Sequence, residues 1–292
     1  MTLTLVQAWT SARDRLKAAG VDSPVIDARL LLEVAADATR ADLLNDPYRT
    51  LDADQTRTLE DYVSRRCQRE PVSHILGRKG FWKIMVGVNS DVLTPRPETE
   101  VIVDHALRAF EEHQAFDLLD LGVGSGAIAL AILAERPAAR GLGVDLSEEA
   151  LAVARENAAN LGLASRLALL RGDWTAGLQD DGFQLVVANP PYIPTRDIES
   201  LDPEVRDHEP RLALDGGEDG LDAYRALAPE ILRVLKPGGL MLVEIGFDQG
   251  ESVPPLFRAA GAEGVEVLKD LSDRHRVVIG RKKILGNPGA SH

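Results

Sequence analysis

The apolar positions of this chain change their spacing along its length, and the changes divide it into parts. Up to about residue 70 they recur at helical spacing, as with Val6, Trp9 and Leu16 ahead of Gly20. From Phe116 to about residue 260, short apolar runs alternate with helix-spaced segments. The pattern predicts a helical N-terminal part followed by a domain of alternating strands and helices.

Helix start signals support the first part. Ser23-Pro24 predicts an N-cap followed by proline at the first helical position. Asp52 and Gln55 have the spacing of a capping box, and Pro71 ends the last helix. We therefore expect residues 1–75 to form a small helical domain.

The next segment, residues 76–95, has a β-type pattern. An apolar run over residues 81–88 and the pair Val92-Leu93 flank Asn89-Ser90-Asp91. Because Asn, Ser and Asp favour turns, the pattern predicts a β-hairpin that links the two domains and turns at these three residues.

The last part, residues 96–284, predicts an α/β fold. Strands are expected at 118–121, 141–144, 167–170, 185–188 and 239–245, with helices at 127–134, 148–161 and 224–235. This alternation is typical of a mostly parallel sheet covered on both faces. Two further runs, 265–268 and 276–280, have no helix between them and predict an antiparallel edge, and residues 285–292 are predicted to be a disordered tail.

Charge and cysteine content narrow the function. The net charge is −13. Residues 1–80 carry 12 acidic and 12 basic side chains, so the whole net negative charge comes from residues 81–292. Stable DNA binding usually shows a basic face, which this part lacks. With one cysteine, Cys67, the chain has no intrachain disulfide and no multi-cysteine metal site. No apolar run approaches the ~20 residues of a membrane span, and no signal peptide is visible, so we expect a reducing, cytoplasmic location.

A glycine-rich segment follows the first strand of the larger domain and opens a helix. It reads Asp120-Leu121-Gly122-Val123-Gly124-Ser125-Gly126. Glycines at such a turn let the backbone approach a ligand closely. Asp145 ends the next strand, where a carboxylate can accept the two hydroxyls of a ribose. The spacing is not that of the dinucleotide motif, but together these features predict nucleoside binding.

Two more strand ends carry candidate residues. Gly172-Asp173-Trp174 follows the third strand, where Asp173 could bind an adenine amino group beside the Trp174 ring. A capping aspartate and a half-buried tryptophan remain the alternative for this pair.

Asn189-Pro190-Pro191-Tyr192 follows the fourth strand. Both prolines lack an N–H donor and stiffen the chain, which leaves the Asn189 side-chain oxygen and the Pro190 carbonyl as acceptors beside an aromatic ring. Such a site suits a planar –NH2 group.

These motifs together resemble the release-factor glutamine methyltransferases, a family of class I S-adenosylmethionine-dependent enzymes. The resemblance rests on the glycine loop, on Asn189-Pro190-Pro191-Tyr192 and on a segment that reads Thr94-Pro95-Arg96-Pro97-Glu98-Thr99-Glu100. It covers nearly the whole chain. Val123 departs from the threonine expected at its position, and the helical domain carries the least motif-like sequence.

The resemblance implies a Rossmann-like class I methyltransferase sheet, with S-adenosylmethionine as cofactor, S-adenosylhomocysteine as product and peptide-chain release factors as partners. The cofactor would contact Gly122, Val123, Gly124, Ser125, Gly126, Asp145, Asp173, Trp174, Asn189, Arg96, Glu98 and Thr99. The substrate glutamine would bind at Asn189, Pro190, Pro191 and Tyr192, with Asn189, Pro190 and Tyr192 as the catalytic residues. Residues 1–75 would recognise the protein substrate. Arg96 and Glu98 could equally form structural ion pairs.

Three alternatives remain open at this point. An amino methyltransferase acting on adenine or guanine of nucleic acid needs the same two acceptors, and Arg65, Arg66 and Arg69 supply some basic character. A non-catalytic nucleotide-binding protein and a nicotinamide oxidoreductase are the others. The histidines show no metal-ligand spacing, so no metal is expected; they are His74, His105, His113, His208, His275 and His292.

Overall fold

The computed structural model describes residues 3–284, and the predicted tail 285–292 lies outside them. Contacts divide the chain into two compact units. One runs from the N-terminus to Arg78 and also contains Asp202–His208, and the other holds Lys79–Leu201 and the chain from Glu209 onward. We call them the helical unit and the sheet unit.

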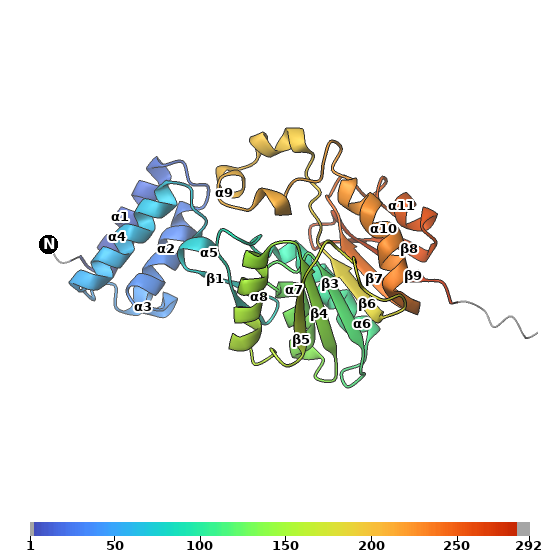
Figure 1. The fold of residues 1–292 in the computed structure, drawn as a ribbon. Helices are drawn as coiled ribbons and strands as arrows, with labels where there is room; N and C mark the ends of the chain where they lie inside the picture. The colour runs from blue at the N-terminus through green and yellow to red at the C-terminus, as the bar shows by residue number, and fades with distance from the viewer. Residues whose placement is uncertain (1–2, 285–292) are drawn as a thin grey trace, which may run out of the picture. The chain divides into compact units, whose positions relative to one another are not determined.

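The helical unit confirms the prediction of an all-helical N-terminal part (Figure 1). Its helices are α1 (Leu5–Ala18), α2 (Pro24–Ala35), α3 (Arg40–Asn45), α4 (Ala53–Cys67), α5 (Val72–Ile75) and α9 (Pro203–Arg206). Its core includes Leu5, Leu16, Leu31 and Val63, each at most 1% exposed. Burial of such side chains is the main force that stabilises a small bundle.

One predicted cap is present and another is not. Asp52 accepts hydrogen bonds from the backbone N–H groups of Asp54 and Gln55, and the Gln55 side chain accepts from the Asp52 N–H, which completes the capping box of α4. Ser23 precedes α2, but its side chain makes no capping hydrogen bond. There Pro24 alone marks the helix start, because its fixed φ suits the first helical position.

The predicted hairpin exists, but its turn was placed wrongly. The two strands are β1 (Arg78–Phe81) and β2 (Ile84–Gly87), so the chain turns at Trp82-Lys83. Trp82 takes a left-handed backbone (φ 53°), and its N–H donates to Glu100 Oε1 at 2.8 Å. Tryptophan gives no turn signal in a sequence, so only this contact to a later helix explains the position.

The sheet unit confirms the α/β prediction. Besides the hairpin, it holds a sheet whose seven strands, within the described residues, are β3 (Asp117–Leu121), β4 (Arg140–Asp145), β5 (Leu167–Arg171), β6 (Phe183–Ala188), β7 (Leu235–Glu244), β8 (Ala262–Lys269) and β9 (His275–Lys282). They lie in the order β5-β4-β3-β6-β7-β9-β8. The first five are parallel, whereas β9 is antiparallel to both β7 and β8. The antiparallel edge is therefore confirmed as well.

Helices cover both faces of this sheet (Figure 1). One face packs against α6 (Glu100–Ala109), α7 (Ala127–Glu135) and α8 (Glu148–Asn160). The other packs against α10 (Asp222–Val234) and α11 (Pro254–Ala259). Central strands point alternate residues to the two faces, and all are buried: Leu185 and Val187 of β6 face the first layer, Val186 and Ala188 the second.

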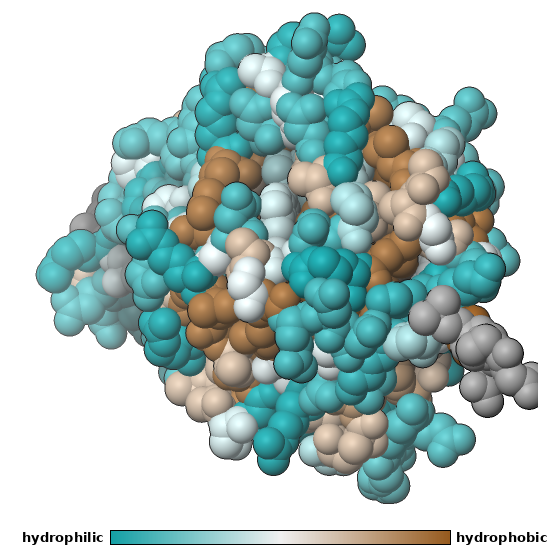
Figure 2. All heavy atoms as spheres, turned by 45° about the vertical axis from the view of Figure 1, so that its right-hand side comes forward, coloured by the Kyte–Doolittle hydropathy of each residue, from teal (hydrophilic) through white to brown (hydrophobic). Residues whose placement is uncertain are grey.

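The connections include three 3₁₀ helices, η1 (Pro97–Thr99), η2 (Thr195–Ser200) and η3 (Arg211–Ala213). No helix within residues 3–284 is long and apolar enough to cross a membrane. Apolar patches interrupt the largely hydrophilic surface in Figure 2. Exposed apolar side chains of the sheet unit include Leu146, Leu212, Phe247 and Leu271.

Candidate active site

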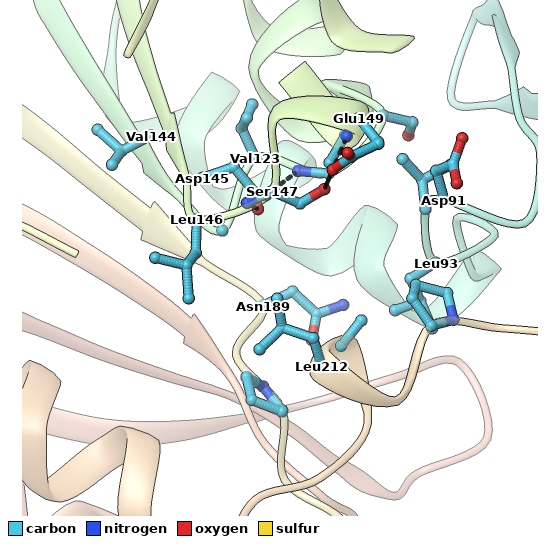
Figure 3. Close-up of a pocket in the computed structure, with 18 of the residues that line it drawn as sticks. Asp91, Leu93, Val123, Val144, Asp145, Leu146, Ser147, Glu149, Asn189 and Leu212 are labelled. Carbon is cyan, nitrogen blue, oxygen red and sulfur yellow. Dashed lines mark hydrogen bonds between the residues drawn. The ribbon is translucent and has the colours of Figure 1, made fainter. Parts of the chain in front are cut away.

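The candidate residues gather at one end of the parallel strands. Because β5, β4, β3 and β6 are adjacent and parallel, the segments that follow them meet along one edge of the sheet. A cavity of about 660 Å³ lies there, within the usual range for a small-molecule site (Figure 3). Predicted residues on its wall are Thr99, Gly122, Val123, Gly124, Ser125, Asp145, Asp173, Trp174, Asn189 and Pro191.

The glycine loop leads from β3 into α7 through left-handed backbone. Gly124 has φ 52° and Gly126 φ 81°, conformations that residues with a β-carbon seldom adopt. A β-carbon on Gly126 would also lie 3.0 Å from Leu130 Cδ1. Gly122 and Gly124 line the cavity and have no side chain, so the backbone itself forms this side and can approach a ligand closely.

Asp145 ends β4 and is held by the backbone around it. Its Oδ2 accepts a hydrogen bond from the Gly124 N–H at 2.9 Å, and its Oδ1 accepts from the Ser147 N–H at 3.0 Å (Figure 3). Each carboxylate oxygen can accept a further hydrogen bond. The carboxylate is thus oriented in advance for a ligand with two donors, such as a ribose.

Trp174 and Asp173 both line the cavity after β5. Trp174 has a left-handed backbone (φ 50°). A β-carbon on Gly122 would lie 3.7 Å from Trp174 Cζ3, which places the ring beside the glycine loop. The pair can therefore offer a flat apolar surface and a carboxylate to a planar ring.

Asp120, which precedes the glycine loop, is a buried carboxyl that sequence reasoning did not single out as a site residue. It is 1% exposed and its Oδ2 accepts from the Ala129 N–H at 3.1 Å. Burial raises the pKa of Asp120 well above its ordinary value; the Ala129 N–H opposes this shift and the charge of Asp145 adds to it. The shift favours the neutral form, in which the group can donate a hydrogen bond.

Asn189 follows β6 directly and lies on the cavity wall with Pro191. No hydrogen bond joins its amide to the other residues drawn in Figure 3. Pro190 is buried, and neither it nor Tyr192 lines the cavity, so their predicted contacts with the substrate stay a prediction. The Asn189 amide is therefore the side-chain acceptor that this segment offers to a ligand.

Arg96 and Glu98 do not line the cavity, and each forms an ion pair elsewhere. Arg96 Nη2 donates to Glu209 Oε2 at 2.7 Å, and Glu98 lies 3.7 Å from Arg274. Burial raises the pKa of Glu209, while Arg96 and Thr94 lower it. Their predicted contact with the cofactor stays a prediction, as does that of Gly126.

Several wall residues were not among the predicted site residues. They come from the segment after the hairpin (90–93) and from the segment 210–213, and they also include Ser147 and Glu149. Their place depends on long-range packing, so sequence spacing could not reveal it. Among residues 3–284, no group of three or more His, Cys, Asp or Glu side chains could hold a metal ion.

The fold is that of a methyltransferase. A crystal structure of a methyltransferase from Pyrococcus furiosus has the same fold, with a TM-score of 0.54 and 17% identity over 76% of this chain and 99% of that one. A methyltransferase-domain family matches residues 112–255, and a family described as the PrmC N-terminal domain matches residues 7–77.

Close relatives give the particular family. The release factor glutamine methyltransferase of Caulobacter vibrioides is 70% identical over 288 residues, which is 99% of this chain and all of the relative. That of Rhodospirillum rubrum is 45% identical over 93% of this chain and 83% of its own length. The chain therefore belongs to the release factor glutamine methyltransferase family and is an enzyme, so the non-catalytic and oxidoreductase alternatives are set aside.

Proposed function

We propose that this enzyme transfers a methyl group from S-adenosylmethionine to the side-chain amide nitrogen of the glutamine in the Gly-Gly-Gln motif of peptide-chain release factors. The observation that carries the proposal is the meeting of the glycine loop, Asp145 and Asn189 in one cavity. A nucleoside site and an amide acceptor are then close enough to act on each other's ligands. The family of the chain names the substrate.

The cavity wall fits the cofactor by its chemistry. Asp145, oriented by two backbone N–H groups, would accept the ribose hydroxyls. Trp174 would lie against the adenine ring and Asp173 would accept from its amino group. The glycine loop would accommodate the methionine part. When bound, S-adenosylmethionine supplies a methyl group on a positively charged sulfur.

What remains for the protein is to orient a poor nucleophile, because an amide nitrogen shares its lone pair with the carbonyl. Asn189 Oδ1 and the Pro190 carbonyl would each accept one N–H of the substrate amide. These two hydrogen bonds orient the nitrogen lone pair toward the methyl group and stabilise the positive charge that develops on nitrogen. The nitrogen then loses one proton to water, so no dedicated general base is needed.

The three arginines that gave the nucleic-acid alternative its basic character are paired with carboxylates. Arg65 pairs with Glu70 at 2.5 Å, Arg66 with Asp27 at 2.8 Å, and Arg69 with Glu204 at 2.8 Å. Side chains neutralised in this way contribute little to phosphate binding. Methyl-labelled S-adenosylmethionine incubated with enzyme and cell extract tests the choice. Label in a release factor supports the proposal, and label in nucleic acid contradicts it.

We also propose that the helical domain recognises the release factor, in a cytoplasmic reaction. A truncation near Val72 is a poor test, because Glu204 lies in the helical unit and is held by Arg66 and Arg69. Hydrogen exchange on the intact enzyme avoids this problem. Added release factor should slow amide exchange in α1 to α4, whereas unchanged exchange there would contradict the proposal.

A further inference from the structure

The side-chain amide of Gln249, in the loop after β7, is buried and fully hydrogen-bonded. Its Oε1 accepts from the Gly246 N–H at 2.9 Å and the Tyr224 hydroxyl at 3.1 Å. Its Nε2 donates to the carbonyls of Tyr192 and Gly220, both at 3.1 Å. The network fixes which end of the amide faces which partner, because a reversed amide would place like groups against each other.

The carbonyl that Gln249 holds belongs to the loop that carries Asn189. Sheet pairing of β6 ends at Ala188, and residues 190 and 191 are prolines, which have no N–H to donate. Beyond the prolines, Gln249 binds the carbonyl of Tyr192. Gln249 therefore helps to hold the far end of the short segment that includes Asn189.

The same amide joins this loop to a second segment. Gln249 also binds the Gly220 carbonyl, and a β-carbon at Gly220 would collide with the Tyr192 carbonyl. The loop continues along this segment, since the N–H groups of Ile193 and Thr195 donate to the carbonyls of residues 214 and 217 at 3.0 and 2.8 Å. Three parts of the sheet unit therefore meet at one amide.

We propose that Gln249 is a positioning residue for methyl transfer, which holds the Tyr192 carbonyl so that Asn189 and the Pro190 carbonyl keep their aim at the substrate amide. The inference rests on the proposed function. Gln249 does not line the cavity, so it acts through the loop and not by contact with either ligand. It should therefore affect turnover more than cofactor binding.

The first test replaces Gln249 by leucine, which has a similar size and no hydrogen-bonding groups. The kcat for release-factor methylation should fall roughly 10- to 100-fold, as expected when a reacting group is misplaced by less than about 1 Å. The affinity for S-adenosylmethionine should stay within about twofold of wild type, because the Asp145 side of the cavity is untouched. A matched control is Gln184→Leu, whose amide binds Asp117 and Lys236 at the start of β6. A Gln249→Leu kcat equal to that of this control would overturn the inference.

The second variant, Gln249→Glu, asks whether the donated hydrogen bond matters. A protonated carboxyl can donate to one of the two carbonyls, and burial favours this form, whereas the ionised form donates nothing. The activity of Gln249→Glu relative to wild type should therefore rise as the pH falls, while that of Gln249→Leu stays flat. A purely space-filling role predicts no such difference, so equal pH profiles would overturn the inference.

Hydrogen exchange separates this inference from the proposed function. The amides of Ile193 and Thr195 should exchange at least about tenfold faster in Gln249→Leu, while Leu119 in β3 is unchanged. This readout needs no substrate. If wild-type enzyme failed to methylate a release factor, the proposed function would be wrong. The exchange rates of these two amides would still show whether Gln249 stabilises the loop. Unchanged exchange at both amides would overturn the inference itself.

Discussion

Asp145 at the end of β4 accepts a hydrogen bond from the backbone N–H of Gly124 in the loop after β3, at 2.9 Å. This hydrogen bond joins the carboxylate at the end of β4 to the glycine loop after β3. The Ser147 N–H donates to the other carboxylate oxygen at 3.0 Å. The two predicted halves of the cofactor site are thus one hydrogen-bonded unit. A change at Asp145 should disturb both.

Replacing Asp145 by alanine should weaken S-adenosylmethionine binding at least about tenfold, because hydrogen bonds to a charged group are worth ~1.5–3 kcal/mol. Isothermal titration calorimetry measures it directly. Asp117→Ala, at the opposite end of β3 and exposed, is the control and should bind normally. Equal affinity in the two variants would remove Asp145 from the ribose site.

Replacing Asn189 by alanine should act on turnover. Loss of a preorganised polar contact at the reacting group typically costs about 100-fold or more in rate. Asn189→Asp keeps an acceptor oxygen and should retain more activity than Asn189→Ala. Single-turnover methylation rates, with cofactor affinity measured in parallel, check this order. Near wild-type turnover in Asn189→Ala would show that its amide is not the acceptor.

The titration of Glu244, at the end of β7, should make the free energy of unfolding depend on pH. Burial raises its pKa to about 7, against the smaller lowering effects of the Thr99 hydroxyl and Arg276. Between its ordinary pKa of 4.5 and about 7, the folded state holds this proton more tightly than the unfolded state does. The stability from this group is therefore fully present below pH 4.5 and is lost as the pH rises through about 7.

Glu244→Gln, which mimics the protonated form, should remove that part of the pH dependence. The free energy of unfolding of the variant, relative to wild type, should be higher at pH 8 than at pH 5 by up to about 3 kcal/mol, since one pKa unit corresponds to about 1.4 kcal/mol. Urea denaturation at both pH values measures it. An unchanged difference would show that Glu244 titrates normally.

Arg66 should be the critical charge of the helical unit. Its side chain is 7% exposed and binds Asp27 at 2.8 Å and Glu204 at 2.9 Å. Arg66→Met would leave the buried Asp27 carboxylate without this partner, while Glu204 keeps its ion pair with Arg69, at a cost of about 3–5 kcal/mol in unfolding free energy. Arg57→Met, from an ion pair whose side chains are 78% and 86% exposed, should cost at most about 1 kcal/mol. Similar losses in both, by chemical denaturation, would contradict the assignment.

The sequence predicted best what depends on local pattern. Buried strands such as 185–188 and helices such as 148–161 were placed within a few residues, because apolar spacing and capping signals act locally. The meeting of Asp145, Asp173 and Asn189 was also predictable, since the ends of parallel strands must lie on one edge.

Features that depend on distant partners were not predictable. The turn at Trp82 depends on Glu100, and the role of Gln249 depends on the carbonyls of Tyr192 and Gly220 in two other segments. The ion pair of Arg96 with Glu209 joins residues more than a hundred positions apart. Spacing along a chain carries no signal for such pairs, because they form only when the fold brings the segments together.

The most direct measurement of the central claim is mass spectrometry of a release factor after incubation with the enzyme and S-adenosylmethionine. The account predicts one added methyl group on the glutamine of the Gly-Gly-Gln peptide, absent when enzyme is omitted and strongly reduced with Asn189→Ala. Duplex DNA and ribosomal RNA, treated in parallel, should gain none. A methylated adenine or guanine with the glutamine unmodified would contradict the account.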